Sequence, residues 1–216
     1  MKYIVGIDEV GRGPLAGPVT VGVVVCESRL YTKLKKDKHL PPRGKDSKKL
    51  TPESRQKYAQ YLKSLQKRVM SKTVFDIVVV HISNKIIDEK GISWAIRHAI
   101  QKGLNKCIKK FSQVSRDLSF NKEQFQILLD GGLRAPVEFR KQKTIIKGDE
   151  KEQIIAWASI LAKVSRDSLM VKAHKKFPEY AFHIHKGYGT QKHRNALVIH
   201  GLSEIHRKSF CKKLAS

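Results

Sequence analysis

Three aspartates stand where an apolar stretch of the sequence gives way to a turn. Asp8 follows the run YIVGI, Asp130 follows QFQILL, and Asp149 follows TIIKG. Side chains at such strand ends leave the edge of a sheet and become accessible. Together with Glu9 they would form a cluster of carboxylates, which repel one another unless a cation such as Mg²⁺ or Mn²⁺ neutralises them. A pair of such metals activates water against a phosphodiester. Spacing alone does not establish that the acids meet.

Each of these acids also has an ordinary structural interpretation. The segment Asp149-Glu150-Lys151-Glu152 precedes an apolar helical stripe and is typical of an N-cap with a capping-box glutamate. Asp8 and Glu9 are also consistent with turn residues, and Asp130 precedes two glycines that favour a turn. On local pattern alone, an N-cap is the better interpretation of Asp149. For the other three acids, a structural role in a turn is as good an explanation as a catalytic role.

The charge balance indicates the class of partner. The chain has 44 Lys and Arg against 19 Asp and Glu, a formal net charge of +25. A surface of this kind attracts polyanions at ordinary salt. Ribosomal-type and membrane-surface proteins are basic as well, so the charge favours a nucleic-acid partner without naming a reaction.

Cysteine and histidine spacing argues against a disulfide framework or a zinc site. Cys26, Cys107 and Cys211 are odd in number, far apart and outside any CxxC pair, which suits a reducing cytosol. Six of the nine histidines fall between His174 and His206, yet no zinc-ligand spacing accompanies them. No apolar run approaches the roughly 18 residues that a membrane span needs. We therefore expect a cytoplasmic protein without a membrane partner.

Hydrophobic periodicity predicts alternating strands and helices, and hence an α/β fold. The basic stretch 31–50, with its Pro-Pro pair, predicts a long exposed loop. We expect a catalytic core over 1–171 and a helical, basic C-terminal region over 172–216 that packs on it as one structural unit. The predicted strands are 3–7, 19–26, 74–82, 124–130 and the run beginning at 144, and the predicted helices cover 52–67, 92–104 and 154–164.

A longer motif surrounds the first two acids. Residues 6–18 read GIDEVGRGPLAGP, and this segment closely resembles the opening signature of the ribonuclease HII family. The resemblance continues in order through 46–50 (DSKKL), 130–131 (DG), 147–149 (KGD), 158–164 (ASILAKV), 166–167 (RD) and 185–190 (HKGYGT). It spans nearly the whole chain.

The resemblance implies a ribonuclease H-like mixed sheet flanked by helices, with Asp8, Glu9, Asp130 and Asp149 as catalytic residues and ligands of Mg²⁺ or Mn²⁺. Asp149 would then be both helix cap and metal ligand. Asp167 also matches the family, but its place inside a predicted helix favours an ion pair, so we leave it outside the catalytic set.

Other matched positions imply substrate contacts. The family associates Gly11, Arg12 and Gly13 with recognition of the ribonucleotide, where glycines allow close approach and Arg donates to phosphate. Tyr188 would stack on the sugar and sense the 2′-hydroxyl, or else anchor its loop. Lys48, Ser159 and Lys163 are candidates for phosphate binding, with solvated surface as the alternative, and His185 and His193 are candidates for phosphate contact or packing.

The implied activity is endonucleolytic cleavage of RNA in RNA–DNA hybrids and at single ribonucleotides in duplex DNA, leaving 3′-hydroxyl and 5′-phosphate ends. We expect a monomer. Ribonuclease HIII is a rival, but its extra N-terminal domain would not fit before Asp8, and it lacks this Arg-Gly-Pro. A non-catalytic duplex-binding protein on the same scaffold is a rival of another class, and the retention of all four acids argues against it.

Overall fold

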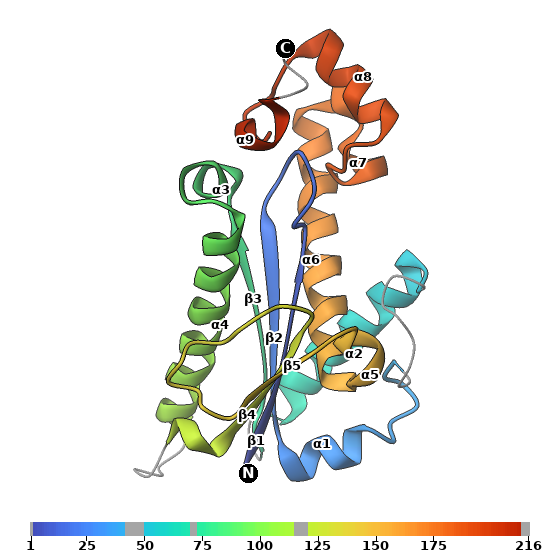
Figure 1. Cartoon of the computed structure of the whole chain (residues 1–216). Coiled ribbons are helices and arrows are strands. Elements are labelled where there is room, and N and C mark those ends of the chain that lie inside the picture. The colour runs from blue at the N-terminus through green and yellow to red at the C-terminus, as the bar shows by residue number, and fades with distance from the viewer. Residues whose placement is uncertain (1, 42–49, 70–72, 115–120, 213–216) are drawn as a thin grey trace.

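A five-stranded mixed sheet runs through the centre of the molecule, with long helices on both faces (Figure 1). The computed structural model describes residues 2–41, 50–69, 73–114 and 121–212. The strand order is β3-β2-β1-β4-β5, with β1, β2 and β3 antiparallel and β1, β4 and β5 parallel. The strands are β1 (Tyr3–Val10), β2 (Val19–Glu27), β3 (Phe75–Ile82), β4 (Phe125–Asp130) and β5 (Gln142–Ile145).

Two hydrophobic cores lie on opposite faces of the sheet. The alternation of side chains along β1 sends Val5 and Ile7 toward α4 (Ile92–Val114), while β2 sends Val24 toward α6 (Gln153–Lys176). Both faces are covered, so the strands read as nearly continuous apolar runs. The other helices are α1 (Ser28–Leu34), α2 (Pro52–Val69), α3 (Asn84–Lys90), α5 (Gly148–Lys151), α7 (Phe182–His185), α8 (Gln191–His200) and α9 (Lys208–Cys211), with short 3₁₀ turns η2 (Lys122–Gln124) and η3 (Pro178–Tyr180).

Two glycines let α6 lie directly against the sheet. A Cβ on Gly6 of β1 would come within 2.2 Å of the Ile154 carbonyl oxygen. A Cβ on Gly22 of β2 would come equally close, at 2.2 Å, to the Ala158 carbonyl oxygen. Because Gly22 pairs with Asp8 across the β1–β2 ladder, the close approach of α6 brings Ser159 to Asp8. The glycines therefore set the position of one wall of the candidate site.

The C-terminal elements form a third, smaller core around the far end of α6. In Figure 1 this long helix continues past the sheet to meet α7, α8 and α9. The small core contains Ala16, Met170, Tyr180, Phe182, Ala196 and Leu197. Between residues 172 and 212 the structure contains helices and turns with one isolated bridge, Ala16 to His206, and no strand, as predicted. The proposed boundary at residue 171 falls inside α6 and stays a prediction.

The predicted strands and helices are all present, but β1 continues to Val10 instead of ending at Ile7, and α4 and α6 continue well past their predicted ends, to Val114 and Lys176. Two further predictions were wrong. Residues 31–34 belong to α1 rather than to an exposed loop, and Tyr31, Leu34 and Leu40 are buried. In the sequence, lysines are interspersed among these apolar residues, so the apolar stripe that packs on the sheet is hard to recognise. Asp149 does not cap a helix, because it lies inside the short helix α5, whose N-cap is Lys147, and Glu152 precedes α6. No helix within the described part of the chain is long and apolar enough to cross a membrane.

Candidate active site

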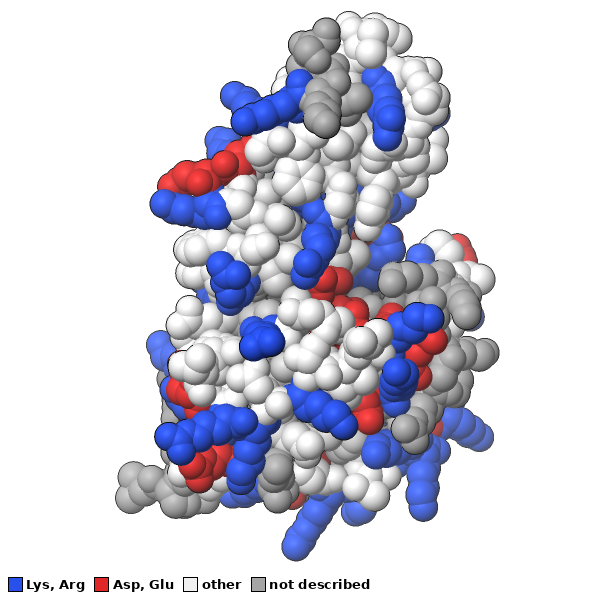
Figure 2. Space-filling view, viewed as in Figure 1, with Lys and Arg blue, Asp and Glu red and all other residues white. Residues whose placement is uncertain are grey.

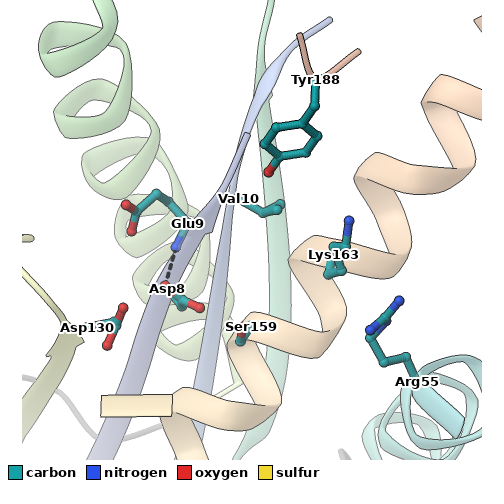
Figure 3. Close-up of a pocket in the computed structure, with 8 residues that line it drawn as sticks. All are labelled: Asp8, Glu9, Val10, Arg55, Asp130, Ser159, Lys163 and Tyr188. Atoms are coloured by element: carbon teal, nitrogen blue, oxygen red, sulfur yellow. Dashed lines mark hydrogen bonds between the residues drawn. The ribbon is translucent and has the colours of Figure 1, made fainter. Parts of the chain in front are cut away.

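The register of two parallel strands brings Asp8 and Asp130 together. Ile7 of β1 pairs with Leu129 of β4, so the next residue of each strand stands at the same edge of the sheet. Figure 3 shows the Asp8 and Asp130 side chains on neighbouring strands, with Glu9 one residue further along β1. They open into a cleft of about 470 Å³. Its lining residues are Asp8, Glu9, Val10, Arg55, Asp130, Ser159, Lys163 and Tyr188.

Asp8 is the most deeply placed of these acids, with 5% of its surface exposed. Burial raises its pKa well above the ordinary value, and the neighbouring Glu9 and Asp130 carboxylates raise it further. Two hydrogen bonds oppose this shift. The Ser159 hydroxyl donates to Asp8, and the Glu9 backbone N–H donates to Asp8 Oδ1 at 2.7 Å. The Asp8 carboxylate is therefore fixed in orientation, and no positive side chain among the described residues is paired with it to balance its charge.

Glu9 is held by an ion pair at the mouth of the cleft. Arg12 Nε lies 3.1 Å from Glu9 Oε1. Burial raises the pKa of Glu9, Arg12 lowers it, and the nearby Asp130 raises it again. Arg12 itself points to solvent and does not line the cleft. It therefore acts on the site through Glu9.

Asp130 and Asp149 are linked through the backbone of α5. The Gly148 N–H donates to Asp130 Oδ1 at 2.6 Å, which fixes the Asp130 carboxylate beside the start of that helix. Asp149 is the next residue, and only 7% of its surface is exposed. It is not among the residues that line the cleft. The structure thus unites Asp8, Glu9 and Asp130 in the cleft and leaves Asp149, next to the residue that contacts Asp130, out of its lining.

Helices α6 and α2 supply the cationic wall opposite the acids. Ser159 and Lys163 lie one turn apart on α6 and both line the cleft, as the spacing predicts. Lys163 Nζ is 2.9 Å from Asp167 Oδ1, which confirms the ion pair predicted for Asp167. Arg55, one turn into α2, faces the same cleft and donates to the Leu50 carbonyl at 2.7 Å. Sequence reasoning missed Arg55, because no motif marks it among so many cations.

Tyr188 stands over the cleft from the C-terminal region, with its hydroxyl directed toward Val10 (Figure 3). It is 40% exposed, which excludes a buried anchor. The Arg166 guanidinium lies 5.9 Å from the Tyr188 ring centroid, against its face. The predicted sensor of the ribose is therefore available to a ligand.

Two buried arginines fix the loop that carries Gly11, Arg12 and Gly13. Arg207 donates to the carbonyls of Gly11 (2.7 Å), Arg12 (3.0 Å) and Gly17 (2.9 Å), while Arg166 donates to those of Ala16, Pro18 and Lys186. Gly11 has φ +89° and would place a Cβ 2.2 Å from Arg166 Nε, whereas Gly13 has open space. Gly11 therefore serves packing as well as access. Sequence reasoning missed Arg207 because its partners lie near the other end of the chain.

Two further candidates, His185 and His193, do not line the cleft. Both are buried and hydrogen-bonded to backbone carbonyls, which leaves almost no surface to offer a phosphate. Lys48 lies outside the described residues. Figure 2 shows acidic side chains in the hollow between the C-terminal lobe and the sheet, with Lys and Arg on either side.

The donor set fits a hard divalent cation in type. Three carboxylates share one cleft, and burial together with repulsion from neighbouring carboxylates penalises the charged forms of Asp8 and Glu9, so a cation would relieve a real electrostatic cost. Among the residues that the structure describes, no group of three or more His, Cys, Asp or Glu side chains is close enough to form a ready-made metal site. The acids therefore surround the cleft without converging on one point.

Comparison with known proteins gives consistent matches along the chain. The family model described as ribonuclease HII matches residues 5–213. A ribonuclease HII of Clostridioides difficile is 39% identical over 98% of this chain and 71% of its own. The crystal structure of ribonuclease H2 from Pyrococcus horikoshii covers 99% of this chain and 97% of its own, with 26% identity and a TM-score of 0.65. Bst-RNase HIII in complex with Mn²⁺ has a TM-score of 0.62 over 99% of this chain and 70% of its own, and at 16% identity it supports the fold alone.

Proposed function

The chain belongs to the ribonuclease HII family and is thus an endoribonuclease acting on RNA–DNA substrates, and on that premise we propose that the cleft around Asp8, Glu9 and Asp130 is its active site. We infer that it also cuts at single ribonucleotides in duplex DNA, leaving 3′-hydroxyl and 5′-phosphate ends. The observation that carries this proposal is the meeting of Asp8 and Asp130 directly after the last residues at which β1 and β4 pair.

Asp8, Glu9, Asp130 and Asp149 would hold divalent cations, either Mg²⁺ or Mn²⁺. A structural neighbour, Bst-RNase HIII, is known in complex with Mn²⁺. Two bound cations would activate a water and stabilise the leaving 3′-oxygen of a phosphodiester. The raised pKa of Asp8 supports this role, because a carboxylate that is costly to charge alone gains most from a cation.

The protein's own side chains prepare the site before substrate arrives. Ser159 and the Gly148 N–H hold the Asp8 and Asp130 carboxylates in fixed orientations, so little reorganisation is needed. Lys163 and Arg55 present cations on the opposite wall, where they would receive phosphates that flank the scissile bond. The substrate strand would therefore lie between the acidic and the basic wall.

Tyr188 and the loop Gly11–Gly13 would distinguish ribose from deoxyribose. The Tyr188 ring is exposed over the cleft and suits stacking against a sugar, with its hydroxyl directed toward Val10 on the strand that carries Asp8 and Glu9. Gly13 has open space around it, so its backbone can approach a sugar closely.

The test is a duplex with one ribonucleotide, incubated with Mg²⁺ or Mn²⁺ beside an all-DNA duplex and an RNA–DNA hybrid. Cutting only at the ribonucleotide and within the hybrid, with 3′-hydroxyl and 5′-phosphate ends, is expected. Binding without cutting would favour the non-catalytic alternative. Equal cutting of the all-DNA duplex would contradict ribose recognition.

A further inference from the structure

A second hollow lies on the other side of Arg12 from the carboxylates. It encloses about 170 Å³. Three structural elements form it: α4, the turn that follows β4, and the loop after β1. Its lining residues are Arg12, Ser93, Ile96, Arg97, Ile100, Gly132, Leu133 and Arg134. We call it the arginine groove.

The arginine groove shares two of its walls with the active-site cleft. The β1 end contributes Glu9 to the cleft and Arg12 to the groove, and the β4 end contributes Asp130 to the cleft and Arg134 to the groove. The Glu9–Arg12 ion pair spans the boundary between them. Figure 1 shows the segment between β4 and β5 extending toward α4. Helix α4 forms the far wall of the arginine groove. A ligand bound in the cleft would therefore lie next to the arginine groove.

Two of the three cations in the arginine groove, Arg97 and Arg134, have no acidic partner among the described residues. None of its lining side chains is acidic. Arg97 and Arg134 are exposed and make no ion pair or hydrogen bond with another described side chain, and Arg12 has only Glu9. Like charges around a small hollow repel one another, and an anion would relieve the repulsion. Arg also presents a planar fork of donors that matches phosphate oxygens.

The backbone beneath these arginines is firmly held. Arg207 donates to the Arg12 carbonyl at 3.0 Å, and Thr144 Oγ1 donates to the Leu133 carbonyl at 2.9 Å, next to Arg134. The floor consists of the buried side chains Ile96, Ile100 and Leu133. Arg97 is exposed at the rim of α4, beside the buried Ile96, and lines the same hollow. A shallow apolar floor with cationic walls suits a sugar-phosphate, whose sugar is less polar than its phosphate.

We propose that the arginine groove is a second seat for the sugar-phosphate backbone of the duplex, in which Arg97 and Arg134 bind a phosphate that lies beyond the cleft. The proposal rests on the proposed function, because it assumes that a duplex occupies the cleft. Its ligand is a backbone phosphodiester, which either strand of the duplex can supply. The seat would hold the duplex at a fixed offset from the carboxylates.

The test compares two double variants with the same net charge. Arg97→Gln/Arg134→Gln removes the groove cations, whereas Arg29→Gln/Arg140→Gln removes two exposed arginines that do not line the groove. Affinity for a ribonucleotide-containing duplex is measured over a range of salt concentrations, with a chelator present to prevent cutting. Each lost phosphate contact reduces the slope of log K against log salt by about 0.9. Because Arg97 and Arg134 share one phosphate in this proposal, we expect the groove variant to lose about 0.9 from the slope and the control to keep it.

A second measurement identifies the strand. Neutral methylphosphonate linkages are placed one at a time in either strand, and a linkage at the seat should weaken wild-type binding but leave binding by the groove variant unchanged. An unchanged slope in the groove variant, an equal loss in the control, or no such linkage in either strand would overturn the proposal. The salt slopes report binding and not cutting. Failure of the wild-type protein to cut the duplex once metal is added would therefore contradict the proposed function and not the second seat.

Discussion

His193 Nε2 lies 2.9 Å from His206 Nε2, and the bonds on either side of this contact determine which nitrogen carries each proton. His193 Nδ1 lies 2.9 Å from the Tyr188 carbonyl, which can only accept, so Nδ1 carries the hydrogen and Nε2 is the acceptor. His206 Nε2 must then donate. Its Nδ1 accepts from the Ser203 N–H at 2.9 Å.

This series of hydrogen bonds ends at the backbone carbonyl of Tyr188, the residue that faces the ribose in our proposal. After Ser203, each group in this series, His206, His193 and the Tyr188 carbonyl, accepts a hydrogen bond from the group before it. This order of donors and acceptors requires both rings to be neutral. A proton on His193 Nε2 would face the His206 N–H, and a proton on His206 Nδ1 would face the Ser203 N–H and have only the Ser203 Oγ, at 2.8 Å, as acceptor. Both rings have 1% or less of their surface exposed, so water cannot replace these partners. The position of the Tyr188 loop should therefore respond to acid.

Acid should destabilise the protein through His206. Burial, and then the nearby His193, lower the pKa of His206 from 6.5 to about 4. Above pH 6.5 the ring is neutral in both the folded and the unfolded state. Between pH 6.5 and 4 only the unfolded state takes up the proton, so stability falls by about 1.4 kcal/mol per pH unit and roughly 3 kcal/mol in all. Below pH 4 this contribution is constant.

Urea unfolding of the wild type and His206→Gln at pH 7, 6 and 5 checks this expectation. Gln keeps a donor near the Nε2 position but does not titrate, so the variant should lose less stability on acidification. His193 and His185 face the same ring and also have lowered pKa values, so some dependence on pH should persist. Equal slopes in the two proteins would contradict the assignment.

The bond from His193 to the Tyr188 carbonyl should matter for activity. In His193→Asn the amide nitrogen can replace Nδ1 as donor, whereas His193→Leu leaves the carbonyl without its partner. Loss of one such bond costs about 1.4 kcal/mol, or tenfold. We expect kcat/KM on a ribonucleotide-containing duplex to fall roughly tenfold for Leu and to be largely retained for Asn. An equal loss in both variants would indicate that His193 serves packing alone.

Arg207 should be needed for the stability of the loop that carries Gly11 and Arg12. Arg207→Met would leave the three carbonyls that it now satisfies without a donor in a buried site. We expect a loss of about 2–4 kcal/mol of unfolding free energy, together with weaker duplex binding. Arg194→Met is the matched control, since Arg194 is exposed and donates only to the Gly189 carbonyl. Similar stability of the two variants in chemical denaturation would refute the role of Arg207.

Gly22→Ala should damage the site without touching a proposed catalytic residue. The added Cβ would come within 2.2 Å of the Ala158 carbonyl and push α6 away from the sheet, which moves Ser159 from Asp8. Overpacking of this kind typically costs about 1–3 kcal/mol. Gly132→Ala, where a Cβ meets nothing within 4 Å, is the control for stability. A thermal midpoint as high for Gly22→Ala as for the control would contradict the close approach.

The end of β4 at Asp130 was predictable because its signal is local, an apolar run followed by two glycines. The end of β1 was not, because that strand continues through Asp8 and Glu9 to Val10 in its pairing with β2, and only the family motif linked Asp8 to Asp130. The contacts that hold the site together are of another kind. Arg207 and Gly11 are separated by 196 positions, and no period in the sequence reports that pairing.

Asp149 shows the limit of local signals in another way. Its position before an apolar helical stripe favoured a cap, but the chain enters α5 through Lys147 at φ +54° and breaks at Glu152 before α6 begins. The break leaves Asp149 inside a single helical turn beside Asp130. Backbone geometry of this kind depends on the packing of β4 and α6, which the local sequence does not encode.

The most direct test of the active-site assignment is the single-turnover cutting rate of a duplex with one ribonucleotide, compared between Asp130→Asn and Asp167→Asn. Both changes remove one carboxylate charge, but Asp130 lines the cleft while Asp167 pairs with Lys163 beyond it. We predict that Asp130→Asn lowers the rate by at least about 100-fold, whereas Asp167→Asn changes it by less than about tenfold. Equal losses in the two variants, or near wild-type cutting by Asp130→Asn, would contradict the account.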